Sequence, residues 1–358
     1  MEENIKLNRE VFNRGNFDKL LASDEPTDSW RNAIYYFLQN WFDDSDFIIS
    51  HTSGSTGAPK EIRLLKTAMR NSARMTNTFF GLDETKTALL CLPASYIAGK
   101  MMLVRAIVGG FNLIAVKPKA NPFKTLDFPI YFTAITPYQL SYSAETLKTK
   151  PVQNIIVGGG HVNSKMEEVA AEIPASMYET YGMTETCSHI ALRCLNGAKR
   201  SDYFTSLEGV TIDLDERGCL VISAPHLLTN EIVTNDIVEL HGTHNFRWLG
   251  RADSVINSGG VKIFPEQVEK KLGKIISSNF FIASLPDVKL GSKVVLVIES
   301  DRYTIEKMDD LKSRLAICLQ KFEFPKEIYF LPTFIYSQSN KVLRKETLGK
   351  ALEKSNCL

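Results

Sequence analysis

The chain has 358 residues, of which 44% are hydrophobic and 23% charged, and its formal net charge is +1. This composition is typical of a globular protein and excludes a fully disordered chain or a coiled coil. A net charge so close to zero also argues against a protein whose whole surface binds nucleic acid. The length predicts two or three domains.

The apolar segments of the sequence give no sign of membrane insertion. The first ten residues lack the basic start and apolar core of a signal peptide. The longest apolar stretch, residues 101–116, is interrupted by Arg105 and is too short to span a bilayer. The six cysteines form no CxxC pair, which argues against a zinc knuckle or a disulfide framework. We therefore expect a cytoplasmic protein with reduced thiols and no membrane span.

The first two thirds of the chain alternate between helical and strand-like segments. Residues 1–46 are predicted to be a helical preface, because their apolar residues between Trp30 and Trp41 share one helical face. Apolar runs then predict strands at 88–92, 112–116, 131–135 and 155–157, and a helix follows at 164–172. This alternation indicates an α/β fold with buried, mostly parallel strands.

The pattern changes after about residue 205. Short strands separated by turns are predicted at 210–214, 218–223, 237–240 and 246–249, as in a small antiparallel sheet or barrel. Beyond Arg251 we expect a mixed α+β unit with helices at 265–272 and 304–320 and a strand at 294–299. A domain boundary near 252–254 would give an N-terminal domain of residues 1–252 and a C-terminal domain of residues 253–358.

The charge is unevenly divided at this boundary. Residues 254–358 carry a net charge of +5, and the rest of the chain carries −4. The difference has two interpretations: chance, or a C-terminal module that meets an anionic ligand.

The strongest local motif follows the predicted strand at residues 47–50. It reads His-Thr-Ser-Gly-Ser-Thr-Gly-Ala-Pro-Lys-Glu, from His51 to Glu61. Glycines allow backbone N–H groups to close on a phosphate, the hydroxyls donate hydrogen bonds, and Lys60 neutralises charge. The segment is not a Walker A loop, because Gly57 is followed by Ala-Pro. A flexible Ser/Gly loop is the alternative interpretation.

Four further motifs follow along the chain: the one at residues 248–269 is highly specific, and the other three are weak in isolation, each with a structural alternative. In the segment 178–186, Tyr181 offers a flat face for a base and Glu185 a hard oxygen for Mg²⁺. Asp236 lies in a predicted turn and has a carboxylate that could hold ribose hydroxyls. The remaining two are residues 248–269, which include a Ser-Gly-Gly run, and the basic cluster at 339–346.

In this order and spacing, the five motifs resemble those of the adenylate-forming superfamily of acyl- and aryl-CoA ligases, luciferases and adenylation domains. The resemblance runs from about residue 47 to about residue 347. It implies a large α/β N-terminal domain with mostly parallel sheets and a small β-barrel-like subdomain, followed by a small mobile α+β C-terminal domain. It also implies a reaction in two steps. A carboxylate first attacks the α-phosphorus of Mg·ATP, and the thiol of coenzyme A then displaces AMP.

The resemblance assigns a role to each matching position. The phosphate loop would comprise Thr52, Ser53, Gly54, Ser55, Thr56, Gly57 and Lys60. The adenine and the acyl group would lie against Gly158, Gly159, Gly160, Tyr181 and Gly182. Thr184 would touch phosphate, Glu185 would hold Mg²⁺, and Asp236 would bind the ribose with Arg251. Asp253 would be the hinge, Ser258, Gly259 and Gly260 would line the tunnel for coenzyme A, and Lys341 would reach the α-phosphate and the carboxylate. The sequence departs from the usual pattern at Asn235 and Asn340, which replace glycine, and at Tyr96, which replaces the gating histidine.

Two segments, Ser258–Gly260 and Tyr96–Met102, resemble the o-succinylbenzoate–CoA ligases of menaquinone biosynthesis. That acid carries a second carboxylate, and a cation would have to offset its desolvation. The candidates are Lys100, Arg105, His189 and Arg193, each of which could instead be a structural or surface charge.

Two alternatives stay open: another aryl- or acyl-acid CoA ligase, and a non-catalytic nucleotide- or carrier-protein-binding relative. The expected partners are a small carboxylic acid, ATP and coenzyme A, without nucleic acid. Because little of the usual preface is present before the phosphate loop, we expect either a more open acyl site or one that a second copy of the chain covers in a homodimer.

Overall fold

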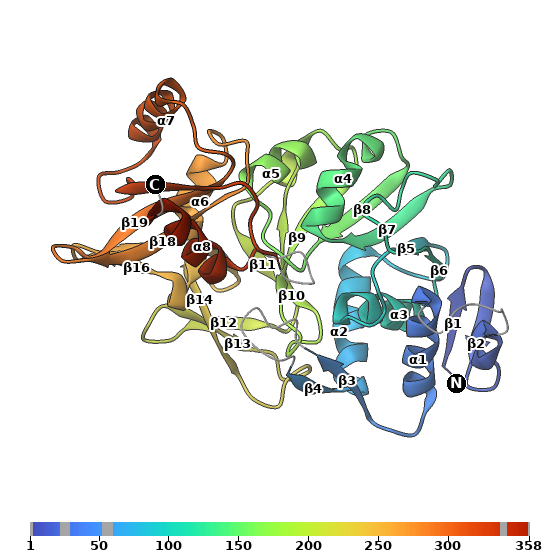
Figure 1. Cartoon of the computed structure of the whole chain (residues 1–358). Coiled ribbons are helices and arrows are strands. Elements are labelled where there is room, and N and C mark those ends of the chain that lie inside the picture. Colours follow the sequence, from blue (N-terminus) through green and yellow to red (C-terminus); the bar gives the residue numbers. More distant parts are fainter. Residues whose placement is uncertain (1–2, 22–28, 52–59, 337–341, 357–358) are drawn as a thin grey trace.

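The structure, a computed structural model, describes residues 3–21, 29–51, 60–336 and 342–356 (Figure 1). Its described residues form a 13-stranded sheet, a five-stranded sheet and a two-stranded ribbon. The ribbon consists of β3 (Phe47–His51) and β4 (Glu61–Leu65). The two larger sheets are connected through the short 3₁₀ helix η3 (Ala252–Ser254).

One half of the large sheet is parallel, as the apolar runs predict. Its strands lie in the order β9-β8-β7-β5-β6-β1, and every neighbouring pair is parallel. Their bounds are β1 Asn4–Leu7, β5 Thr87–Leu90, β6 Asn112–Ala115, β7 Ile130–Ile135, β8 Val152–Val157 and β9 Ser176–Gly182. The α/β class predicted from the sequence is confirmed.

Helices cover both faces of this parallel half. They are α1 (Trp30–Phe42), α2 (Lys66–Phe80), α3 (Ile97–Gly109), α4 (Pro137–Leu147) and α5 (Ser164–Ala171). Successive strand residues point to opposite faces, so Ala88 and Leu90 pack with α1, α2 and α3, whereas Leu89 packs with α4 and α5. The strands are therefore buried on both sides, which explains their continuous apolar runs.

The other half of the sheet is antiparallel and begins where β9 pairs with β10. The strands are β10 His189–Cys194, β11 Phe204–Ser206, β12 Thr211–Leu214, β13 Cys219–Ser223, β14 Ile232–His241 and β15 Asn245–Arg251, with the 3₁₀ turn η2 at Gly197–Lys199. These are the strands that the sequence sets apart as a small antiparallel sheet or barrel. Their antiparallel pairing is as predicted, and they continue the parallel strands within one hydrogen-bonded sheet.

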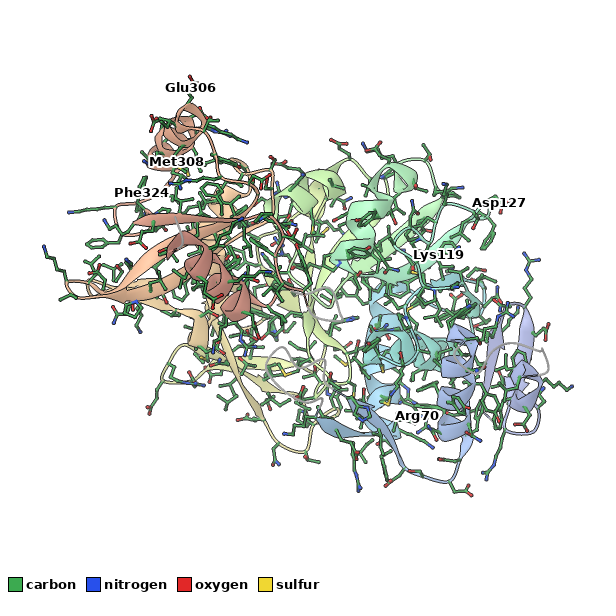
Figure 2. All side chains as sticks on the ribbon, viewed as in Figure 1. Arg70, Lys119, Asp127, Glu306, Met308 and Phe324 are labelled. Carbon is green, nitrogen blue, oxygen red and sulfur yellow. The ribbon has the colours of Figure 1, made fainter. Side chains whose placement is uncertain are left out.

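The predicted helical preface is wrong for its first part. Strands β1 and β2 (Glu10–Asn13) form an antiparallel hairpin, and η1 (Phe17–Leu21) and α1 follow it. Asn8 and Arg9 make the turn with φ of 51° and 72°, the left-handed geometry of a tight hairpin. Arg70 of α2, which Figure 2 labels, donates hydrogen bonds of 2.7 and 2.9 Å to Glu3 and so ties the hairpin to the body of the protein.

The five-stranded sheet follows η3 and has cores of its own. Its strands are β16 Ile256–Ser258, β17 Val261–Ile263, β18 Phe280–Asp287, β19 Gly291–Glu299 and β20 Glu327–Leu331, and its helices are α6 Pro265–Leu272, α7 Ile305–Cys318 and α8 Arg344–Asn356. Its buried clusters contain only residues from 256 onward. In the described part of the chain, no helix is long and apolar enough to cross a membrane.

Candidate active site

A cavity of about 690 Å³ lies at the carboxyl ends of the parallel strands. Leu92 comes after β5, Thr136 directly follows β7, Gly158 follows β8 and Met183 follows β9, and all four line the cavity. Open α/β sheets characteristically bind their ligands outside the carboxyl ends of the strands. The topology of the sheet thus gathers loops that are far apart in the sequence around one site.

The cavity brings together many of the residues singled out in the sequence. Those that line it are Arg105, Gly158, Gly159, Gly160, Tyr181, Gly182, Thr184, Glu185, His189, Asp236 and Arg251. The phosphate-loop residues Thr52, Ser53, Gly54, Ser55, Thr56 and Gly57 lie outside the described residues, and so does Lys341. Lys60, the first described residue after the loop, is exposed.

Other predicted residues lie elsewhere. Among the described residues, Tyr96 and Lys100 are not part of the cavity lining; Tyr96 is exposed, and Lys100 Nζ donates to the Ile49 carbonyl at 2.7 Å. Burial lowers the pKa of Lys100. Asp253 lies in η3, 3.6 Å from Arg251. Ser258, Gly259 and Gly260 make the turn between β16 and β17 in the second sheet.

Close packing requires glycine at two positions of the cavity wall. A Cβ at Gly182 would lie 2.4 Å from the Ser188 carbonyl oxygen, and a Cβ at Gly158 would lie 2.3 Å from the Thr180 hydroxyl. Contacts below 3.0 Å force the neighbour to shift. The Ser188 contact is the more demanding, because its oxygen belongs to the backbone.

Asp236 is held in the cavity wall by two hydrogen-bond donors and one ion pair. Tyr181 donates from its phenol at 2.7 Å, Trp248 donates from its indole at 3.2 Å, and Arg251 Nε lies 3.8 Å away. Burial, followed by the charge of Asp236, raises the pKa of Tyr181 far above its ordinary range, so the phenol remains a donor. The Tyr181 ring packs edge-on against Phe204 and Phe246, which fixes its plane.

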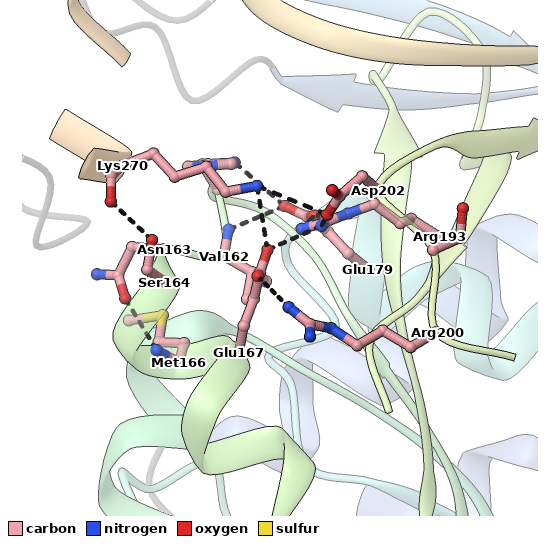
Figure 3. Close-up of polar contacts among 12 residues, drawn as sticks. Val162, Asn163, Ser164, Met166, Glu167, Glu179, Arg193, Arg200, Asp202 and Lys270 are labelled. Atoms are coloured by element: carbon pink, nitrogen blue, oxygen red, sulfur yellow. Dashed lines mark hydrogen bonds and ion pairs between the residues drawn. The ribbon is translucent and has the colours of Figure 1, made fainter. Parts of the chain in front are cut away.

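An ion network supports the adjoining wall (Figure 3). Glu179 Oε2 accepts from Arg193 Nε at 2.9 Å, and its Oε1 accepts from the Val162 N–H at 2.8 Å and lies 3.3 Å from His161 Nδ1. Burial would raise the pKa of Glu179, but His161 and Arg193 outweigh it and hold the pKa below its ordinary value. Glu179 and His161 both line the cavity. Sequence reasoning missed these two residues, because nothing in the sequence pairs them with Arg193.

The same network reaches the second sheet. Arg193 also donates to Glu167 at 2.8 Å, and Arg200 donates to Glu167 at 3.2 Å. Lys270 of α6 lies 3.9 Å from Glu167, and the Ser164 hydroxyl donates to the Lys270 carbonyl at 2.9 Å (Figure 3). Arg193, a sequence candidate for a substrate carboxylate, is thus engaged by two buried glutamates.

Arg105 is a buried cation in the cavity wall. The residue is only 2% exposed, and among the described residues its guanidinium contacts Ser188 and Met102 and no carboxylate. Its Nη2 donates to the Ser188 hydroxyl and its Nη1 contacts Met102 Sδ at 3.6 Å, but its Nε has no partner in the described part of the chain. Burial lowers the pKa of Arg105 to about 9. A buried charge of this kind needs an anion to compensate it.

The exposed carboxylate of Glu185 fits a magnesium ion that is carried with a nucleotide. The described residues contain no group of three acidic, histidine or cysteine side chains that could form a complete metal site. Mg²⁺ in nucleotide sites is usually held by one or two carboxylates together with substrate phosphates and water. Glu185 lines the cavity beside Thr184 and offers one such oxygen ligand.

Comparison with known proteins assigns the family. The family model described as AMP-binding enzyme matches residues 10–214. The chain belongs to the AMP-binding enzyme family. It is 36% identical to an acyl-CoA synthetase (AMP-forming)/AMP-acid ligase II-like protein from Dyadobacter fermentans, with 93% of this chain and 97% of that chain covered and a TM-score of 0.61.

Two further relatives concern a particular acid. A 2-succinylbenzoate–CoA ligase of Lactococcus lactis is 24% identical, with 93% of this chain and 80% of that enzyme covered. The structure of O-succinylbenzoate coenzyme A synthetase from Bacillus subtilis, in complex with ATP and magnesium, has a TM-score of 0.68. The two sequences are 20% identical, and the match covers 84% of this chain and 69% of the Bacillus enzyme. The similarity is evidence for the fold.

These matches confirm the superfamily predicted from the five motifs. The chain is an adenylate-forming acid–CoA ligase, a class of enzyme that uses ATP, Mg²⁺ and coenzyme A. The residues that line the cavity bear on the identity of the acid substrate.

Proposed function

We propose that this AMP-binding enzyme converts 2-succinylbenzoate to its coenzyme A thioester, as a step of menaquinone biosynthesis. The observation that carries the proposal is Arg105, a buried cation without a carboxylate partner among the described residues, in the wall of the cavity. 2-Succinylbenzoate has two carboxylates, so one can react while the other pairs with Arg105. A monocarboxylic acid would leave this charge uncompensated.

The reaction requires positioning and charge neutralisation more than covalent help from the protein. In the first step the succinyl carboxylate attacks the α-phosphorus, and pyrophosphate leaves. In the second step the thiol of coenzyme A gives its proton to water and attacks the acyl carbon, and AMP leaves. We assign the ribose hydroxyls to Asp236, the adenine face to Tyr181, the phosphates to Thr184 and the phosphate loop, and Mg²⁺ to Glu185.

We further propose that residues 1–252 and 253–358 are two domains that rotate about Asp253. The separate buried clusters on either side of η3 support this division. Rotation would bring Lys341 to the first step and the Ser258–Gly260 turn to the second. Replacing Lys341 by alanine should slow pyrophosphate release and spare thiol attack on supplied acyl-AMP. An equal loss in both steps would contradict this role.

The test of the acid is ATP–pyrophosphate exchange with 2-succinylbenzoate, benzoate and fatty acids, followed by mass spectrometry of the coenzyme A product. We expect 2-succinylbenzoate to have the highest kcat/KM. Arg105→Met, which keeps the volume and removes the charge, should abolish this preference. Arg74→Met is the matched control, because Arg74 is exposed on α2 and hydrogen-bonds Asn71. A monocarboxylate that outcompetes 2-succinylbenzoate would instead indicate another aryl- or acyl-acid ligase.

A further inference from the structure

A chain of hydroxyl and imidazole groups leads to Arg105 from behind the cavity wall. His189, the first residue of β10, is only 6% exposed, and each of its ring nitrogens has one hydroxyl neighbour. Nε2 lies 3.2 Å from the Thr76 hydroxyl of α2, and Nδ1 lies 3.3 Å from the Ser188 hydroxyl. The Ser188 hydroxyl is also the acceptor for Arg105 Nη2.

The direction of these hydrogen bonds follows from counting protons. The Thr76 hydroxyl lies 3.2 Å from the Ser72 carbonyl, one turn back on the same helix, and that carbonyl can only accept. The hydroxyl of Thr76 therefore donates its single proton to the Ser72 carbonyl, and its oxygen accepts a hydrogen bond from His189 Nε2. His189 then carries its proton on Nε2 and presents a lone pair at Nδ1.

The lone pair at Nδ1 determines what Ser188 does. The Ser188 hydroxyl donates its proton to His189 Nδ1, which leaves its oxygen lone pairs for the guanidinium of Arg105. The series runs in one direction, from Arg105 through Ser188, His189 and Thr76 to the Ser72 carbonyl. Each hydroxyl both donates and accepts, so neither hydroxyl can turn without breaking two hydrogen bonds.

We propose that His189 is a positioning residue, which orients Arg105 through Ser188 and thereby sets the preference for an acid with two carboxylates. The inference rests on the proposed function of Arg105 as the partner of the second carboxylate. His189 itself supplies no charge to the substrate in this arrangement. This positioning role replaces the sequence expectation that His189 is a cation for the second carboxylate.

The environment of His189 keeps the ring neutral. Burial, followed by the charge of Arg105, holds the pKa of His189 well below its ordinary value. Among the described residues, the ring nitrogens lie within hydrogen-bonding distance of the two hydroxyls, and the charge that acts on the ring is that of Arg105. A protonated ring would place two buried cations side by side, joined only through Ser188.

The first test is direct and uses the unaltered protein. Histidine ring nitrogens of the ¹⁵N-labelled full chain are observed by NMR at pH 7, and His189 is assigned by the loss of its signals in His189→Asn. We expect a neutral ring with the proton on Nε2. A proton on Nδ1, or an imidazolium, would overturn the proposal, because Ser188 would then have no acceptor for its own proton at the ring.

The second test compares two replacements that each keep one half of the imidazole. Asparagine places an oxygen near the position of Nδ1 and can still accept from Ser188, whereas glutamine places its amide near Nε2 and serves Thr76. We expect the KM for 2-succinylbenzoate, relative to that for benzoate, to rise by about tenfold in His189→Gln and by less in His189→Asn. A residue with a purely structural role would show no such order.

His226→Asn is the matched control, because His226 is a half-buried histidine outside the cavity lining formed by the described residues. Equal KM ratios in both His189 variants and the wild type would overturn the inference. If Arg105→Met abolishes the preference while the His189 variants keep it, the positioning role fails and the proposed function stands. If the wild type shows no preference for 2-succinylbenzoate, the proposed function fails, whereas the NMR experiment still decides the direction of the series.

Discussion

The phenol of Tyr181 donates a hydrogen bond of 2.7 Å to the carboxylate of Asp236, 55 residues away in the sequence. Strand β9 supplies the tyrosine and β14 supplies the aspartate, and the antiparallel half of the sheet brings the two strands to the same end of the cavity. The hydrogen bond fixes one carboxylate oxygen of Asp236, while Trp248 and Arg251 hold the other.

Tyr181→Phe should therefore weaken nucleotide binding selectively. The variant keeps the ring and removes one donor from Asp236, so we expect the KM for ATP to rise about threefold to tenfold, since one hydrogen bond contributes about 0.5–1.5 kcal/mol. The KM for the acid should change little in steady-state pyrophosphate release. Tyr203→Phe, whose ring packs on His241, is the control. An unchanged KM for ATP would contradict the role of this contact.

Two arginines that bind the same glutamate should differ sharply in their effect on stability. Arg193 is buried between Glu167 and Glu179, so Arg193→Met leaves two buried carboxylates without their main partner. We expect a loss of about 3–5 kcal/mol in the free energy of unfolding. Arg200 also binds Glu167 but is 58% exposed, and Arg200→Met should cost less than about 1 kcal/mol. Urea denaturation of both variants measures the difference, and similar losses would show that burial is not the deciding factor.

A methyl group at Gly182 should damage both folding and activity. The new Cβ would meet the backbone oxygen of Ser188 at 2.4 Å and push apart β9 and the start of β10. Overpacking of this kind typically costs about 1–3 kcal/mol, and pyrophosphate exchange should fall with it. Gly349→Ala is the opposite case. The new Cβ would project from α8 into open space, and alanine should stabilise the helix by up to about 1 kcal/mol relative to glycine. Thermal melting and exchange assays on the two variants separate these effects.

His189 should make the protein sensitive to acid. In the folded chain its pKa is lowered, so below about pH 6.5 the unfolded chain takes up a proton that the folded chain does not. The free energy of unfolding should consequently fall with decreasing pH by up to about 1.4 kcal/mol per pH unit from this group alone. His189→Gln should flatten the slope measured by urea denaturation between pH 6.5 and 5. Identical slopes in the wild type and the variant would contradict a buried neutral His189.

The parts of the fold that the sequence predicts are those with one dominant physical cause. Parallel strands such as β7 and β8 are buried on both faces, so their residues form continuous apolar runs, and α6 begins at Pro265 as expected. The β1–β2 hairpin was not predicted, because its turn uses Asn8 and Arg9 instead of glycine and because β1 owes its place to pairing with β6, about a hundred residues on.

The candidate site was predictable only where a motif marks it. Tyr181, Glu185 and Asp236 belong to recognisable segments, and all three line the cavity. The signal for Arg105 was weaker: it is a single arginine within an apolar stretch. Arginine is rarely buried without a partner, so its position there was notable. The supporting contacts of Glu179 and His189 depend on which strands become neighbours, and no local pattern of the sequence carries that information.

Asp236 and Arg251 face each other as one pair of the ladder between β14 and β15, and Arg251 is the last residue before η3. The pair thus belongs both to the cavity and to the connection with the second sheet. In the rotation proposed about Asp253, a turn of the chain at residues 252–254 would strain this pair, and a ribose bound to Asp236 would oppose that turn. Such a coupling is reciprocal, so the nucleotide and the orientation of the second sheet would bias one another by the same free energy.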